Sequence, residues 1–253
     1  MAAMYNKIVI LTGAGISAES GIKTFRDADG LWENEPVEAV ATPEGFERDP
    51  ERVIAFYDER RAGLKKAEPN AAHHALVKLE EKFGDNFLLI TQNVDDLHQR
   101  AGSKRIIPMH GELLKIRCLG PQEHIIPCAE NQPKECPECG AKMRPHIVWF
   151  GEIPFEMERI QKALTKCDLF AYIGTSGVVY PAAGFRQMAK LSGAHVVCLN
   201  LEEVGGGYTD EFIQGKAGEV VPKWVALRVN PVNRGSPSTP QHSSPLSQKQ
   251  RLF

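Results

Sequence analysis

The sequence predicts an α/β protein, with a parallel sheet that is flanked by helices and joined to a smaller lobe. Short apolar runs of strand length recur along the chain, helical patterns lie between some of them, and two longer segments interrupt the alternation. Strands that alternate with helices build open, twisted parallel sheets. The apolar runs, which are typical of strands buried on both faces, lie at residues 7–11, 87–91, 106–108, 169–173 and 195–199.

Helix signals stand between these runs. Asn70 can cap a helix with one apolar face, and Gly84 can end it. Residues 154–166 and 181–191 each carry a proline near a helix start. A further helix is expected after Asp49, which is a good N-cap and precedes a proline.

The two interrupting segments are expected to form the smaller lobe. Residues 29–67 would be a helical insertion, and residues 111–144, which hold most of the cysteines, would be a zinc-ribbon-like module. The rest would form a Rossmann-like domain from residues 1–28, 68–110 and 145–228. Residues 229–253 are too polar to bury, and we expect them to be disordered.

Composition limits the partners of the chain. Its 253 residues carry a net charge of −2, which gives no electrostatic reason to expect a nucleic-acid partner. The apolar runs are too short to span a membrane, and the first residues lack the basic and apolar regions of a secretory signal. We therefore expect no membrane partner and a cytoplasmic location. We also expect a monomer.

A glycine turn follows the first apolar run. Gly13 and Gly15 allow backbone angles and close approaches that a Cβ would forbid, and a helix start after such a turn can hold phosphate. The alternative is a plain connection between strand and helix. A dehydrogenase would also show a second strand that ends in an acidic residue about 20 residues on, but no strand precedes residues 27–32.

Polar residues follow the other strands, at the edge where an open α/β sheet binds its ligand. Gln92, Asn93 and Asp95 come directly after the second run, and buried polar groups there need partners. His110 follows the third run and can accept and return a proton near neutral pH, although a structural histidine is the alternative. The last two runs are followed by Gly174, Thr175, Ser176, Asn200, Leu201 and Glu202.

The helix after Asp49 carries an arginine on its apolar face. Val53, Tyr57 and Arg60 share this face. A buried guanidinium needs a partner, and a carboxylate can be held by two hydrogen bonds; the Tyr57 hydroxyl can donate to the same group. The alternative is an arginine that lays its apolar stem along the helix and keeps its charge in water.

Four cysteines indicate a metal site. Cys136 and Cys139 have the spacing of a zinc knuckle, whereas Cys118 and Cys128 lie farther apart than the pair of a zinc ribbon. Either a long loop brings Cys128 round to complete four ligands, or one ligand is missing. Reduced thiols without metal remain the alternative to both. A closed tetrahedral zinc site would be structural.

Taken together and in this order, these motifs resemble the sirtuins, a family of NAD-dependent protein deacylases, over residues 7–228. The resemblance implies NAD and zinc as cofactors, proteins or peptides with acylated lysine as partners, and nicotinamide and O-acyl-ADP-ribose as products. It makes His110 the group that activates a ribose hydroxyl, while Asn93 orders the ribose and Asp95 holds the nicotinamide carboxamide. These three residues are the expected catalytic set.

The resemblance also implies the binding residues. Phe25 and Arg26 would lie in a mobile cofactor loop. The expected cofactor-binding residues are Gly13, Ala14, Gly15, Ser17, Glu19, Thr24, Phe25, Arg26, Trp32, Gln92, Asn93, Asp95, Gly174, Thr175, Ser176, Asn200, Leu201, Glu202 and Ala217. The expected substrate-binding residues are Ala41, Tyr57, Arg60, Val148, Phe150, Gly151 and Glu152.

The resemblance is to the bacterial subclass that removes acidic acyl groups. In that subclass a tyrosine and an arginine three residues apart bind the acyl carboxylate, as Tyr57 and Arg60 could, and a small residue at the position of Ala41 widens the pocket. Residues 144–152 would pair with the substrate backbone, unless they form an ordinary core strand. We therefore expect activity on succinyl- or malonyl-lysine as well as acetyl-lysine.

Three other functions remain open at this point. A Rossmann-type oxidoreductase would use the same glycine turn and transfer hydride to a small substrate. A protein ADP-ribosyltransferase would share the cofactor and the first chemical step. A zinc-ribbon binding module would have a partner but no turnover.

Overall fold

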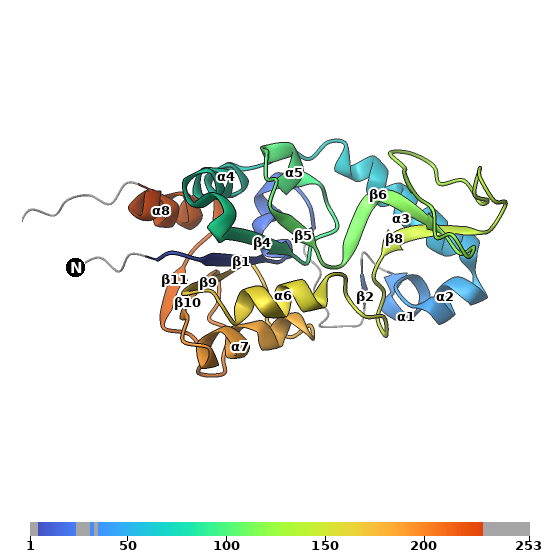
Figure 1. Ribbon diagram of the computed structural model, residues 1–253. Helices are drawn as coiled ribbons and strands as arrows, with labels where there is room; N and C mark the ends of the chain where they lie inside the picture. Colours follow the sequence, from blue (N-terminus) through green and yellow to red (C-terminus); the bar gives the residue numbers. More distant parts are fainter. Residues whose placement is uncertain (1–4, 24–30, 33–34, 230–253) are drawn as a thin grey trace, which may run out of the picture.

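The computed structural model describes residues 5–23, 31–32 and 35–229. The expected cofactor residues Thr24, Phe25 and Arg26, and all but the first residue of the polar C-terminal segment, lie outside these ranges. The described chain forms a large lobe around one sheet and a smaller lobe beside it (Figure 1). None of the described helices is long and apolar enough to cross a membrane.

The large lobe contains a six-stranded parallel sheet in the order β11-β10-β9-β1-β4-β5. All five predicted strands are confirmed, and β11 was not predicted. The strands are β1 (Ile8–Thr12), β4 (Phe87–Thr91), β5 (Ile106–Pro108), β9 (Leu169–Ile173), β10 (His195–Asn200) and β11 (Glu211–Gln214).

Both faces of this sheet are covered, which explains why its strands are apolar throughout. Ile8 and Ile10 of β1 share a core with residues of α4 (Ala71–Phe83) and α8 (Ala217–Val229). Figure 1 shows both helices on one face of the sheet. Val9 and Leu11 point to the other face, toward α6 (Met157–Leu164) and α7 (Phe185–Leu191). The carboxyl ends of the parallel strands therefore gather at one edge.

Local signals set the helix boundaries. The Asn70 side chain accepts a hydrogen bond from the Ala72 N–H at the start of α4, and Gly84 ends that helix. Asp49 does the same for α3 (Pro50–Leu64). The helix predicted over 154–166 is shorter, and the one over 181–191 divides into η5 (Ala182–Gly184) and α7.

The helix expected directly after the glycine turn is absent from the described chain. Two short 3₁₀ turns, η1 (Ala14–Ile16) and η2 (Ala18–Ser20), stand there instead. The second turn ends at Gly21, which adopts a left-handed conformation with φ of 84°. Another 3₁₀ turn, η4 (Gly84–Asn86), leads into β4.

The smaller lobe combines helices with an antiparallel sheet, and its buried side chains form a core of their own. In the three-stranded sheet, β6 lies between β7 and β8. The elements are β2 (Leu31–Trp32), β3 (Glu35–Pro36), α1 (Val37–Val40), α2 (Pro43–Arg48), α3, β6 (Gly111–Cys118), β7 (Ile125–Pro127) and β8 (Met143–Ile147). The core of this lobe joins α1–α3 to residues that follow β4 and β8. The short helix α5 (Leu97–Ala101) instead packs against α4 of the large lobe, where the His98 ring meets His73 (Figure 1).

Candidate active site

Two of the predicted glycine motifs face each other at the end of the large sheet. The Gly13 N–H donates to the Ile173 carbonyl at 3.0 Å, and the Gly15 N–H donates to the Gly174 carbonyl at 2.8 Å. The approach is so close that a Cβ on Gly15 would lie 2.7 Å from the Gly174 Cα. The turn after β1 and the turn after β9 thus form one unit.

A buried polar network lies next to these turns. The Ser17 hydroxyl donates to a carboxylate oxygen of Asp95 at 3.0 Å, and the Asn93 side-chain amide donates to the Ser17 oxygen at 3.0 Å. All three side chains are buried. Burial raises the pKa of Asp95, although hydrogen bonds from the Leu97 N–H and from Ser17 oppose this effect. The structure therefore brings Asn93 and Asp95 together, as expected, through Ser17.

His110 lies directly after β5, with one ring nitrogen held by the backbone. Its Nδ1 lies 3.1 Å from the Gln92 carbonyl oxygen. Since a carbonyl can only accept, Nδ1 carries the proton and Nε2 keeps its lone pair. Burial lowers the pKa of His110, and the hydrogen bond to Gln92 only partly offsets this. The ring is therefore neutral at pH 7, with Nε2 available as a base.

The carboxyl ends of β9 and β10 border a cavity of about 360 Å³. Its lining includes Ser176, Asn200 and Glu202, all of them predicted cofactor residues. The Asn200 amide donates to the Thr175 carbonyl at 3.0 Å, which ties the two strand ends together. Leu201 is largely exposed.

Two further predicted cofactor residues meet at the start of α8. The Glu19 carboxylate accepts a hydrogen bond of 2.6 Å from the Gly218 N–H, beside Ala217. A carboxylate is favourable at a helix N-terminus. The structure thus gives Glu19 a local role at this helix start.

The residues of the predicted acyl pocket lie in the smaller lobe, whereas the glycine turns belong to the large lobe. Tyr57 is fully buried, and the Arg60 guanidinium stacks over the Phe56 ring at 3.1 Å. Trp32, expected near the cofactor, packs edge-on against Phe56 and Tyr57. Ala41 is buried at the end of α1. Trp32, Ala41, Tyr57 and Arg60 therefore belong to one lobe.

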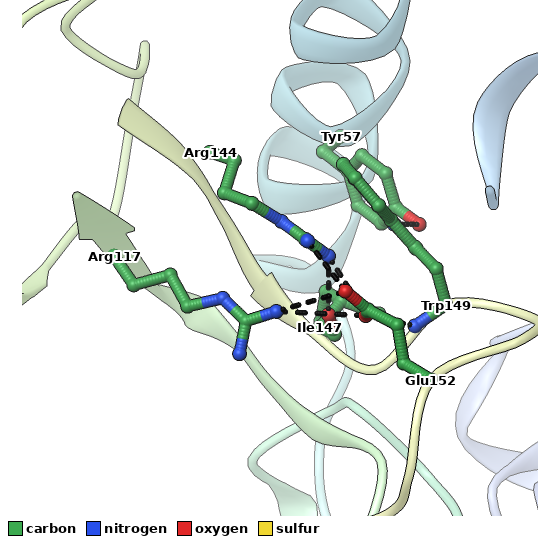
Figure 2. Close-up of polar contacts among 6 residues, drawn as sticks. All are labelled: Tyr57, Arg117, Arg144, Ile147, Trp149 and Glu152. Atoms are coloured by element: carbon green, nitrogen blue, oxygen red, sulfur yellow. Dashed lines mark hydrogen bonds and ion pairs between the residues drawn. The ribbon is translucent and has the colours of Figure 1, made fainter. Parts of the chain in front are cut away.

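The predicted substrate strip, residues 144–152, begins within β8 and continues beyond its end. The Val148 N–H donates to the His110 carbonyl, and the Phe150 N–H donates to the Ala41 carbonyl, each at 2.9 Å. Phe150 and Gly151 are exposed. The Glu152 carboxylate instead turns inward and accepts hydrogen bonds from Arg144 and from the Trp149 N–H (Figure 2).

Sequence reasoning missed a neighbour of Arg60. The fully buried arginine of α3 is Arg61, whose Nε donates to the Leu113 carbonyl at 2.9 Å and whose guanidinium also pairs with Asp58. Arg61 therefore joins α3 to β6. The helical pattern did not single out Arg61, because this residue lies at the border of the apolar face.

A cluster of metal-binding side chains lies in the three-stranded module. Cys118, His124, Cys136 and Cys139 each present a ligand atom, and these atoms lie within 4.8 Å of one another. The Cys118 and Cys139 sulfurs are 3.9 Å apart, close to the value of about 3.8 Å that two Zn–S bonds of about 2.3 Å give in a tetrahedron. This donor set of three thiolates and one imidazole fits structural zinc.

Cys128 lies outside this cluster, contrary to the expected set of four cysteines. Its sulfur donates to the Glu130 carbonyl at 3.3 Å, and the side chain is buried. His124 takes the fourth place because its Nδ1 lies 3.4 Å from the Cys136 sulfur. The spacing of His124 after Cys118 was a signal that sequence reasoning passed over.

Comparison with known proteins agrees with this geometry. The model of the Sir2 family matches residues 13–181. An NAD-dependent protein deacylase of Pasteurella multocida is 56% identical over 87% of this chain and 97% of its own length. The NAD-dependent protein deacylase of Escherichia coli K12 is 53% identical over 91% of this chain and 85% of its own length.

Solved structures show the same fold. A Sir2 homologue in complex with NAD is 39% identical, has a TM-score of 0.80, and matches over 87% of this chain and 88% of its own. A Sir2 protein bound to a myristoylated histone peptide is 34% identical, has a TM-score of 0.69, and matches over 89% of this chain and 91% of its own.

Proposed function

The chain belongs to the Sir2 family, and from that membership we infer that it is an NAD-dependent protein deacylase. The curated relatives at 53–56% identity carry this name. Their similarity favours a deacylase over an oxidoreductase, which the glycine turn alone would also fit. Peptides with acylated lysine are the substrates. We also propose a monomer that works in the cytoplasm, where the thiols of the cysteine cluster stay reduced.

The described residues fit NAD. Two facing glycine turns, a buried acid beside them and a cavity at the next strand ends form a continuous edge of the sheet. When bound, NAD supplies the ADP-ribose that receives the acyl group as nicotinamide leaves. Asn93 and Asp95 stay in place through Ser17 and are proposed to orient the ribose and the carboxamide.

His110 is proposed as the general base. Its protonated Nδ1 is held by the Gln92 carbonyl, so Nε2 can accept the proton of a ribose hydroxyl. Burial lowers its pKa, which keeps the ring neutral and ready to accept a proton at pH 7. The Val148 N–H holds the carbonyl of the same residue, which fixes the segment that carries the base.

We propose acidic acyl groups, succinyl and malonyl, as substrates besides acetyl. The observation that carries this proposal is the placement of Tyr57 and Arg60 one helical turn apart in an aromatic cluster with Trp32 and Phe56. A guanidinium can hold a carboxylate by two hydrogen bonds, and the aromatic walls exclude water that would weaken the pair. Ala41, the small residue proposed to widen the pocket, precedes α2.

Mass spectrometry of acetyl-, succinyl- and malonyl-lysine peptides, with and without NAD, tests this function. We expect NAD-dependent loss of all three acyl groups. Arg60→Met should lower desuccinylation at least about 10-fold more than deacetylation, since hydrogen bonds to charged groups are the stronger ones. The matched control is Arg52→Met, an exposed arginine of the same helix that pairs with Glu35, which should change neither rate by much.

Two outcomes would contradict different parts of the proposal. A protein that releases no nicotinamide with any peptide is not a deacylase. If Arg60→Met lowers all three rates equally, the arginine does not select the acyl group.

A further inference from the structure

The tyrosine of the proposed acyl pocket has a partner from the substrate strip. The Trp149 Nε1–H donates to the Tyr57 hydroxyl oxygen at 2.9 Å, and both side chains are buried (Figure 2). An indole N–H can only donate, so the tyrosine oxygen must be the acceptor. The chemistry of the two groups alone fixes the direction of this hydrogen bond.

This contact leaves the hydrogen of the Tyr57 hydroxyl available for donation. The oxygen accepts from Trp149, and no acceptor for its own hydrogen is found among the described residues. Burial also raises the pKa of Tyr57 well above its usual value, although the Trp149 hydrogen bond opposes this effect, so the hydroxyl keeps its hydrogen. A buried donor without a partner is costly, and an ionised carboxylate, which only accepts, would supply that partner.

The indole of Trp149 is held in place from both sides. Its ring packs against Phe46, with centroids 5.3 Å apart, and the Arg144 guanidinium lies over it at 3.3 Å. Arg144 in turn donates to the Glu152 carboxylate at 2.7 and 3.0 Å and to the Ile147 carbonyl at 2.9 Å. Figure 2 shows the Glu152 carboxylate between Arg144 and Arg117, both directed toward it.

The Glu152 carboxylate stays ionised in this arrangement. Burial alone would raise its pKa, but hydrogen bonds from Arg144 and the Trp149 N–H lower it below the usual value. A charged, multiply bonded pair of this kind is rigid. The chain of contacts thus runs from Glu152 through Arg144 and Trp149 to the tyrosine hydroxyl.

We propose that Trp149 is a specificity-determining residue, because its indole N–H fixes the Tyr57 hydroxyl as a donor for an anionic acyl group. This inference rests on the proposed use of Tyr57 and Arg60 as the acyl-carboxylate site. Glu152 and Arg144 act as positioning residues that hold the indole. Acetyl-lysine has no carboxylate, so its turnover does not use this hydroxyl.

The test compares kcat/KM on succinyl- and acetyl-lysine peptides of the same sequence. For Trp149→Phe we expect the succinyl-to-acetyl ratio to fall about 10-fold, as for loss of one hydrogen bond to a charged group, and Tyr57→Phe should give the same fall. The double variant should fall no further than either single variant, because both remove one interaction. The matched control is Arg52→Met, an exposed arginine that pairs with Glu35 and does not contact the indole, and it should leave the ratio at the wild-type value.

The proposal is overturned by an equal loss on both peptides in Trp149→Phe, by losses that multiply in the double variant, or by a ratio that falls in Arg52→Met as well. If Trp149→Phe does not fold, the ratio is read on Glu152→Gln, which loosens Arg144 and keeps the indole. A wild-type protein that leaves succinyl-lysine intact refutes both this inference and the proposed acyl range. If Arg60→Met selectively loses desuccinylation but Trp149→Phe keeps the wild-type ratio, this inference alone is refuted.

Discussion

The contact between the two glycine turns should make Gly15 intolerant of a single added methyl group. In Gly15→Ala the Cβ would stand 2.7 Å from the Gly174 Cα, 2.8 Å from its oxygen and 3.1 Å from its carbonyl carbon. Carbon atoms in contact prefer about 3.5–4.0 Å, so the turns must separate by nearly an ångström.

That separation cannot be absorbed by a rotating side chain, because the opposing atoms are backbone. The Gly174 N–H is bonded to the Leu199 carbonyl at 3.1 Å, and its carbonyl accepts from Gly15 itself. Overpacking of this kind costs about 1–3 kcal/mol. For a chain of this size, each kcal/mol lowers Tm by roughly 2–4 °C.

Thermal and urea unfolding followed by circular dichroism measure the effect. The matched control is Gly63→Ala in α3, where an added Cβ meets no described atom within 4 Å. Alanine is the better helix former, so this control should be neutral or more stable by up to about 1 kcal/mol. A Gly15→Ala protein as stable as the wild type, or a control that loses as much, would refute the steric reasoning.

Two further predictions concern pH and metal. Burial lowers the pKa of His73 from 6.5 to about 4. Between these two pH values the unfolded chain binds a proton at this residue that the folded chain does not bind. The free energy of unfolding should therefore fall by about 3 kcal/mol as the pH is lowered from 6.5 to 4. His73→Gln should flatten this slope in urea titrations, and an unchanged slope would exclude His73 as its source. Atomic spectroscopy should find about one zinc per chain in wild type and Cys128→Ser, and less in His124→Asn and Cys139→Ser, because only the last two remove clustered ligands. Loss of zinc in Cys128→Ser with retention in His124→Asn would restore the four-cysteine site.

Features that depend on a single strand and the residues directly after it were predicted well from the sequence. The five apolar runs and the polar groups at their ends are local features, and a parallel sheet brings all such ends to one edge. This is why Gly15 and Gly174, far apart in sequence, could be assigned to the same site. The strand that was missed, Glu211–Gln214, is short and carries polar residues at both ends, so its periodicity is weak.

Residues that act across long separations were harder to predict. The sequence analysis did not single out Arg61, and only the folded chain shows that it bonds to Leu113. His124 was passed over because the spacing of cysteines dominated the interpretation, although a histidine ligand is as acceptable to zinc as a thiolate. Cys128 was chosen by residue type, but the chain directs its sulfur toward Glu130.

The substrate strip explains how catalysis and acyl selection can be linked in one fold. Three consecutive residues bind three different parts: Val148 holds the backbone of His110, Trp149 holds Tyr57, and Phe150 holds the backbone of Ala41. Val148 and Trp149 follow β8, and Phe150 begins a turn in which the Glu152 N–H donates to the Trp149 carbonyl at 3.0 Å. A shift of this strip would therefore move the general base and the acyl pocket together. Selectivity and rate should be separable only by changes, such as Trp149→Phe, that leave the backbone contacts of the strip intact.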